Sequence, residues 1–443
     1  DALTALTTGA TNLAVGHQAL DALTIGRKNI AIGSEALTAA VVDSHNTAIG
    51  EGALQSLNVS SGSGTLIETH NVAVGTNAGA SISLGYYNTI VGSGAGQLFD
   101  TNSHNTVMGY TAASANHDAD GLVAIGSNVM TAALTGAADH SVGVGNAALN
   151  ALTQGAGNVA VGRSAGAGLT TSGYNTAIGF QALTTEILGT HNTALGYQAL
   201  YSQSKGSAVV TGNVGIGVEA GYHNDTGVYN VWMGYKSGTG VDGSSNNNNV
   251  GIGFEAMNGI TTGDSNVAIG YSALSFATDS DGNVAVGSTA GKFITSGQGN
   301  VYVGNLAGQG ITGAKLTGNS NTAVGSGAGL LLQGAADSNV LLGASAGDVI
   351  TTGEGNIVIG KGTDTDDATA TNQAVIGYNA TGQGDNTVTL GNASVTDVHM
   401  SQDSGALVHA SGLKFDTDQT NNIDEANTLD DYEEGTYTAT ATC

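Results

Sequence analysis

A five-residue pattern, Asn-x-Ala-x-Gly, recurs along most of this chain and constrains its fold more than any other feature. Twenty-two glycines align on the pattern from Gly16 to Gly391, and 14 of the 21 intervals between them are 17 residues long. Helical repeats and propeller blades need periods of about 33 to 50 residues, whereas 17 is close to one solenoid coil. Complete copies include Asn12 to Gly16, Asn29 to Gly33, Asn46 to Gly50, Asn175 to Gly179, Asn192 to Gly196 and Asn266 to Gly270.

The residues inside the pattern predict a short β-strand. Val, Ile and Thr dominate the two variable positions, and β-branched residues favour strands. Because successive strand side chains point to opposite faces, Asn, Ala and Gly share one face and the bulky residues share the other. We expect the bulky face to fill the coil interior and the small face to let a neighbouring coil or chain approach, so that both faces are buried.

A second recurrent segment follows each glycine and predicts the rest of the coil. Examples are GHQAL at Gly16, GFQAL at Gly179 and GYQAL at Gly196. We interpret it as a tight turn followed by a second short apolar strand. The fold class is therefore an all-β solenoid, a β-roll of about 22 short coils. The recurrent Asn side chains are predicted to stack as hydrogen-bonded amides, and the recurrent Gly to need positive φ or close packing.

Charge and composition exclude several classes of function. The 35 acidic and 9 basic side chains give a formal charge of −26, which repels nucleic acid and anionic membrane surfaces. No apolar run approaches the roughly 18 residues of a membrane span, so membrane insertion is not expected. No nucleophile motif, metalloprotease motif or phosphate loop is present, and we expect no enzymatic activity and no catalytic residues.

Two regions differ in composition. Residues 1–395 carry the repeats and are predicted to form the shaft, whereas residues 396–443 form an acidic, β-rich C-terminal tail or the start of a distal domain. Within this tail, residues 406–415 and 435–442 alternate as strands do.

The repeat resembles the head repeats of YadA-like trimeric autotransporter adhesins. It is still more similar to the NTAIGYQAL-type repeats of predicted marine phage tail fibres, and Asn175 to Leu183 and Asn192 to Leu200 match that form closely. The resemblance covers roughly residues 1–395. It implies a left-handed β-roll and an intertwined homotrimer, which a small-residue face would also favour.

The end of the chain points to the phage group. Residues 386–398 and 427–436 resemble segments that close a repeat array in phage tail proteins. We therefore expect a structural and adhesive tail fibre in the virion, bound to other tail proteins and presenting a surface to a host glycan or outer-membrane receptor. The alternative is a bacterial or environmental extracellular adhesin filament. An ice-binding solenoid would need regular Thr-x-Thr columns, and Thr is scattered here.

One set of candidates for surface contact lies just before the recurrent Asn. A His or Tyr there could stack on sugars, while an inert corner is the simpler interpretation. These candidates are His45, His70, Tyr87, His104, Tyr174, His191 and Tyr229, and His140 also precedes this position. In a trimer, each histidine could also form a ring around a metal ion.

Insertions and acidic runs are further candidates. The longest interval, Gly50 to Gly75, must carry extra residues outward, where a receptor could contact them. Acidic runs offer a weak possibility of calcium or another divalent cation, but none has EF-hand spacing, and no cofactor or metal site is expected. The runs are Asp279 and Asp281, then Asp364, Asp366 and Asp367, and in the tail Asp430, Asp431, Glu433 and Glu434.

Overall fold

The computed structural model describes residues 1–59, 65–115, 119–134, 138–203 and 210–399. The chain divides into two compact units, Asp1–Ala393 and Ser394–Cys443. Both segments predicted as tail strands, residues 406–415 and 435–442, lie outside the described residues. None of the described residues forms a helix that could span a membrane.

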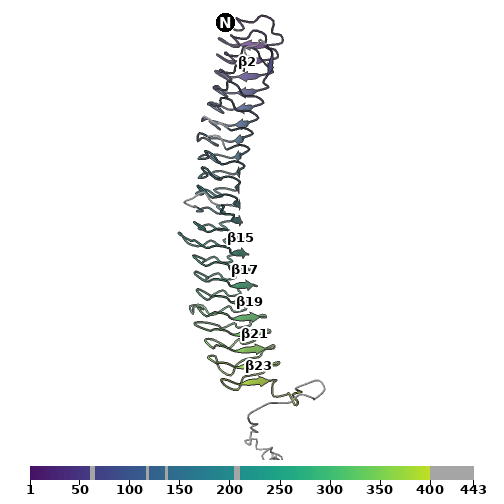
Figure 1. The fold of residues 1–443 in the computed structure, drawn as a ribbon, viewed down its shortest axis with the longest axis vertical. Coiled ribbons are helices and arrows are strands. Elements are labelled where there is room, and N and C mark those ends of the chain that lie inside the picture. Colours follow the sequence, from purple (N-terminus) through teal and green to yellow (C-terminus); the bar gives the residue numbers. More distant parts are fainter. Residues whose placement is uncertain (60–64, 116–118, 135–137, 204–209, 400–443) are drawn as a thin grey trace, which may run out of the picture. The chain divides into compact units, whose positions relative to one another are not determined.

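The first unit is a parallel β-solenoid, as the period predicts (Figure 1). One sheet contains 22 strands, which makes 21 turns of the chain, and a two-stranded sheet joins β3 to β5. The first twelve strands are β1 Leu13–Val15, β2 Ile30–Ile32, β3 Asp43–Ser44, β4 Thr47–Ile49, β5 Ile67–Glu68, β6 Val72–Val74, β7 Thr89–Val91, β8 Thr106–Met108, β9 Val123–Ile125, β10 Val142–Val144, β11 Val159–Val161 and β12 Thr176–Ile178. The others are β13 Thr193–Leu195, β14 Val214–Ile216, β15 Val231–Met233, β16 Val250–Ile252, β17 Val267–Ile269, β18 Val284–Val286, β19 Val301–Val303, β20 Thr322–Val324, β21 Val340–Leu342, β22 Ile357–Ile359, β23 Ala374–Ile376 and β24 Val388–Leu390.

Each strand pairs with the equivalent strand of the next coil in strict register. The central residue of β17, Ala268, lies opposite Ala285 of β18, which in turn lies opposite Tyr302 of β19. The register survives the longer intervals, since β13 pairs with β14 across 21 residues. With strands about 4.8 Å apart, 21 steps give a stack roughly 100 Å long.

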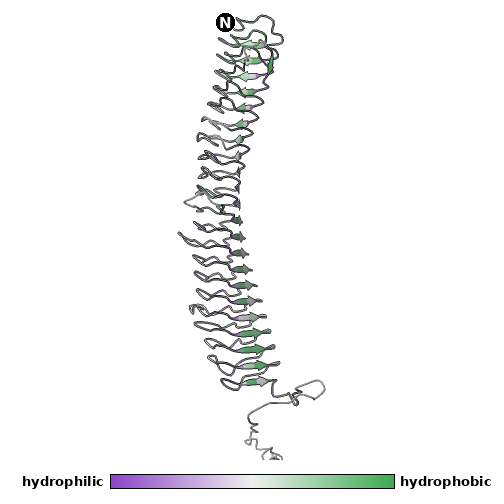
Figure 2. Ribbon diagram, in the orientation of Figure 1, coloured by the Kyte–Doolittle hydropathy of each residue, from purple (hydrophilic) through white to green (hydrophobic). Residues whose placement is uncertain are grey.

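The prediction of which strand face fills the coil was wrong. The small Asn and Ala positions point inward and are buried, whereas the β-branched positions beside them point outward; Ala31 is fully buried but Ile30 is 38% exposed. In Figure 2 the strands form a largely hydrophobic column along the stack. The interior is narrow because a second buried row, which includes Leu20 and Leu37, fills it from the opposite side.

That opposite row is a turn and not the second strand we expected. Leu20 and Leu37 both have φ near +51°, a left-handed conformation that interrupts an extended strand. Coil-to-coil hydrogen bonds hold the turn, with the Leu20 N–H donating to the Ala36 carbonyl at 3.0 Å and the Leu37 N–H to Ala53 at 3.0 Å. Each typical coil therefore has one three-residue strand.

The predicted amide stack is confirmed. The Asn283 N–H and side-chain amide donate to Oδ1 of Asn266 at 2.9 and 3.1 Å, and that amide also donates to the Gly297 carbonyl at 2.9 Å. The contact repeats coil after coil in the buried interior, and it satisfies backbone groups at the bend. Leu122 and Ser141 interrupt this ladder at two successive coils.

The recurrent glycines are needed for both predicted reasons. Gly33 has φ of +140°, and a Cβ there would collide with the carbonyl oxygen of Gly50 in the next coil. The same contact joins Gly50 to Gly75. Glycine at this position thus permits both the left-handed conformation and the spacing between coils.

Interior volume is balanced between neighbouring coils. Trp232 replaces the usual Ala at the centre of β15 and is fully buried. The positions around it are Gly221, Gly238 and Gly251, where a Cβ would overlap the indole ring. Tyr302 in β19 has the same relation to Gly291 and Gly308. A large strand residue is therefore accommodated by glycine where other coils have Leu or Ala.

Candidate binding surface

The predicted contact residues lie in one column, here called the corner column, formed by the residue before each ladder position. All seven candidates have left-handed backbones, with φ between +52° for His70 and +65° for His45. Ser265, Asn248 and Gly282 adopt the same conformation at this position in other coils. The positive φ is thus a requirement of the coil and is not by itself evidence for function.

The corner column brings most of its aromatic side chains together. His45 stacks on His70, His70 on Tyr87 and Tyr87 on His104, with ring centroids 4.7, 5.4 and 5.3 Å apart. Tyr174 and His191 form a second stack at 5.2 Å. Tyr229 is separated from His191 by Gly212, and a Cβ on that glycine would contact the Tyr229 ring.

This packing changes what the corner column can bind. Because neighbouring rings cover each other's faces, sugar stacking is restricted to the ends of each run, and a ring between two others exposes its edge. Tyr87, Tyr174 and Tyr229 are each more than half exposed. The two aromatic runs of the column therefore offer mainly ring edges to a ligand.

A second aromatic column, which sequence reasoning missed, is formed by the residue after each recurrent Gly. Phe180 stacks on Tyr197 at 5.5 Å, and Phe254 lies between Tyr235 and Tyr271 at 5.1 and 5.2 Å. The Arg163 guanidinium lies 5.7 Å from the Phe180 ring centroid. We call this row the post-glycine column. Its signal was present in GFQAL and GYQAL, which we interpreted only as a tight turn followed by a second short apolar strand.

The outer face of the large sheet is apolar. Both outward positions of each strand carry mostly Val, Ile, Leu, Met or Thr, so two columns run beside the post-glycine column. Leu195, Met233, Ile269 and Val303 are each more than one third exposed. A regular apolar surface of this length is typical of an interface rather than of a free surface.

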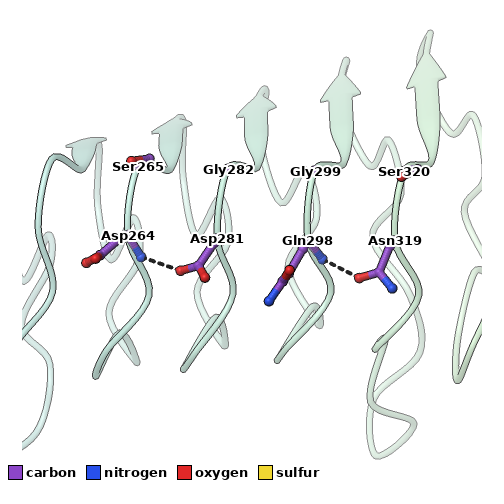
Figure 3. A pocket seen from close by; sticks show the side chains of 8 residues that line it. All are labelled: Asp264, Ser265, Asp281, Gly282, Gln298, Gly299, Asn319 and Ser320. Carbon is purple, nitrogen blue, oxygen red and sulfur yellow. Dashed lines mark hydrogen bonds between the residues drawn. The ribbon is translucent and has the colours of Figure 1, made fainter.

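A shallow depression lies where the corner column carries small residues (Figure 3). It is lined by Ser265, Gly282, Gly299 and Ser320 of the corner column and by the residues that precede them, Asp264, Asp281, Gln298 and Asn319. The Asp264 N–H donates to Asp281 at 2.7 Å and the Gln298 N–H donates to Asn319 at 2.8 Å. The side chains of Asp281 and Asn319 thus accept hydrogen bonds from the backbone of the preceding coil.

The acidic runs have individual structural contacts. Asp366 accepts a hydrogen bond from the Gln373 amide, and Asp367 accepts two from Thr369, which lower the pKa of Asp367. Burial, together with the charge of Asp348, raises the pKa of Asp364 to about 6. The acidic run of the tail, from Asp430 to Glu434, lies outside the described residues.

Two groups in the described part of the chain bring three metal-ligating side chains within 4.8 Å of one another. They are His45 with Glu68 and His70, and His223 with Asp225 and Asp242. The acidic runs singled out in the sequence belong to neither group. Sequence reasoning found His45 and His70 but not Glu68, which lies in the longest insertion.

These features define the chain's first unit as a regular parallel β-solenoid with aromatic columns and an apolar sheet face. No protein-family model matches the chain, and no curated protein matches its sequence.

Proposed function

We propose that the protein is a structural and adhesive fibre rather than an enzyme, and that it serves as a phage tail fibre presenting a surface to a host glycan or outer-membrane receptor. The observation that carries the proposal is the stack of 22 in-register strands, which holds side chains in continuous columns. Where successive coils carry similar side chains, a column repeats a contact at steps of about 4.8 Å, and this arrangement suits repetitive ligands such as surface polysaccharides.

The apolar sheet face supports self-association into a homotrimer. Only a partner with the same strand spacing can keep its side chains in step with these columns over many coils, and another copy of this chain has that spacing. The interface we propose therefore uses the outward β-branched residues, because the small-residue face lies inside the coil. Light scattering should give a mass about three times the 43.5 kDa of one chain.

Paired charges should disrupt this association. Leu195→Glu together with Ile269→Glu places two carboxylates on the sheet face, and Tyr174→Glu together with Tyr229→Glu is the control on the corner column. We expect monomers from the first pair and trimers from the second. A monomeric native chain would contradict the homotrimer.

Immunogold electron microscopy with an antibody to the shaft tests the location. Label along the tail fibres of virions is the expected result. Label on a bacterial envelope would instead support the second candidate, an extracellular adhesin filament, which the same columns could serve.

Receptor contact is tested with glycan arrays. Tyr174→Ala and Tyr271→Ala should each weaken glycan binding, because Tyr174 is 63% exposed and Tyr271 ends a stacked run. Substitution of the exposed Thr262, which lies in neither aromatic column, is the control. Equal binding by all three variants would argue against both aromatic columns as the contact surface.

A further inference from the structure

The longest insertion has a specific structural result. It forms β5, which pairs in parallel with β3 so that Glu68 lies in register with Ser44. The Thr69 N–H donates to the Ser44 carbonyl at 3.1 Å, and the buried Thr69 hydroxyl donates to Asn46 Oδ1 at 2.8 Å. The backbone on both sides of Glu68 is thereby fixed against the preceding coil.

This pairing places a carboxylate beside two stacked histidines. Glu68 Oε1 lies 3.9 Å from His45 Nδ1, and Glu68 Oε2 lies 3.5 Å from His70 Nε2. Ligands about 2.1 Å from a tetrahedral metal are roughly 3.4 Å from each other. Small side-chain rotations would therefore bring all three groups to bonding distance of one ion.

The environment of His45 gives independent support for a bound ion. Its Nδ1 atom is buried and has no hydrogen-bond partner. A buried polar nitrogen without a partner is costly, and a bound ion would satisfy it. Glu68 is 64% exposed, which leaves a route for the ion and a position for water.

We propose that His45, Glu68 and His70 bind one divalent transition-metal ion of the zinc class within a single chain. Two imidazole nitrogens and one carboxylate oxygen suit Zn²⁺, Co²⁺ or Ni²⁺, whereas Ca²⁺ prefers an all-oxygen site. The formal charge of −26 favours cation binding in general, but the nitrogen donors make this site selective.

The chain contains a matched control for this site. His191 occupies the same column and stacks on Tyr174, but its Nδ1 atom lies 2.9 Å from the Thr190 hydroxyl. A substitution there removes a stacked corner histidine without removing a ligand. His223 belongs to the other group of metal-ligating side chains, so His223→Gln provides a background in which that group is incomplete.

The test uses the full chain, stripped of metal with a chelator and carrying His223→Gln. Co²⁺ is followed by visible absorption and Zn²⁺ by calorimetry. We expect one saturable site per chain. Since loss of a supporting residue already weakens metal sites about 10- to 100-fold, Glu68→Gln and His70→Gln should each weaken binding at least that much. His191→Gln should leave the affinity unchanged.

Far-ultraviolet circular dichroism confirms that each variant is folded, and the exposed Glu68 is the safest position to change. Absence of a saturable site would overturn the proposal. So would unchanged affinity in Glu68→Gln and His70→Gln, or an equal loss in His191→Gln. In each case the approach of Glu68 to the two histidines would reflect packing of the insertion and not a metal site. None of these results depends on whether the fibre binds a receptor.

Discussion

At the residue scale, the coil interior is specified by size. The buried Trp232 is compatible with its neighbours only because they are glycines, and the same relation surrounds Tyr302. Glycine thus replaces the usual Leu of this turn in the coils that hold or precede Trp232 and Tyr302, at Gly221, Gly238, Gly291 and Gly308. Replacing one coil with the sequence of another would therefore leave a cavity or an overlap against the neighbouring coils.

Gly238→Ala tests this volume balance. A Cβ at Gly238 would overlap the Trp232 ring, and Gly238 has φ of +58°. Gly282→Ala is the control, because Gly282 has φ of +66° and nothing within 4 Å of its Cβ position. Both variants incur about 1 kcal/mol of backbone strain, and Gly238→Ala should lose a further 1 to 3 kcal/mol from overpacking. Chemical denaturation measures the difference, and equal losses would disprove the packing argument.

The amide ladder makes a second prediction for single residues. Asn266→Ala removes the acceptor of the Asn283 N–H and the donor to the Ser280 carbonyl. Each buried group left unpaired costs about 1 to 3 kcal/mol, so the free energy of unfolding should fall by several kcal/mol. The exposed Asn305→Ala should change it by less than about 0.5 kcal/mol. Thermal unfolding of both variants provides the comparison.

At the scale of the element, the strands were more predictable than the turns. The 17-residue period located the strands because β-branched residues alternate around a constant centre. Alternation defines two faces but does not say which one is inside. That choice depends on Leu20 and its equivalents, whose left-handed backbone directs a large side chain into the coil from the opposite side. The sequence alone gave no sign that a Leu would adopt this conformation.

The candidate site was predictable only in part, for a related reason. A fixed period places His45 and His70 in one column, but Glu68 joins them through the pairing of β3 with β5 inside an insertion. Residues in an insertion do not follow the 17-residue period, so the period does not predict which neighbours they contact. The post-glycine column was missed because its aromatic residues occupy a position that most coils fill with small or polar residues.

A pair of acidic residues in one coil should show opposite dependence on pH. Asp364 has its pKa raised to about 6 by burial and Asp348. The folded chain thus retains a proton that the unfolded chain releases above about pH 4, and stability falls as the pH rises from about 4 to 6. Asp364→Asn should remove this dependence and stabilise the chain at pH 7 by on the order of 1 kcal/mol, after allowance for solvent screening.

Asp367 is the internal comparison. Hydrogen bonds from Thr369 lower its pKa, so the stability it contributes is present above about pH 4 and is lost as the pH falls below that. Asp367→Asn should therefore weaken the chain at neutral pH and have little effect in acid. Denaturation curves at pH 3.5, 5 and 7 follow both variants; matching pH profiles would show that the two local environments are equivalent.

At the scale of the whole solenoid, its length should change in steps of one coil. Deleting residues 267–283 joins Asn266 to Val284 and preserves the ladder, the strand register and the recurrent Gly. We expect this variant to fold and to be shorter by about 4.8 Å. Deletion of residues 267–275 breaks the register and should prevent cooperative folding of the adjoining coils. Electron microscopy and thermal unfolding distinguish the two outcomes.

The parallel stacking of coils also determines how the solenoid would respond to tension. If the two ends of the stack are pulled apart, each coil has to detach from one neighbour, and its hydrogen bonds break together because they lie in one plane. An extended chain spans at most about 3.3 to 3.6 Å per residue, so a 17-residue coil should release roughly 55 to 60 Å per rupture. The 25-residue interval from Gly50 to Gly75 should release roughly 85 Å. The step lengths in a force-extension trace would thus match the lengths of the intervals between recurrent glycines.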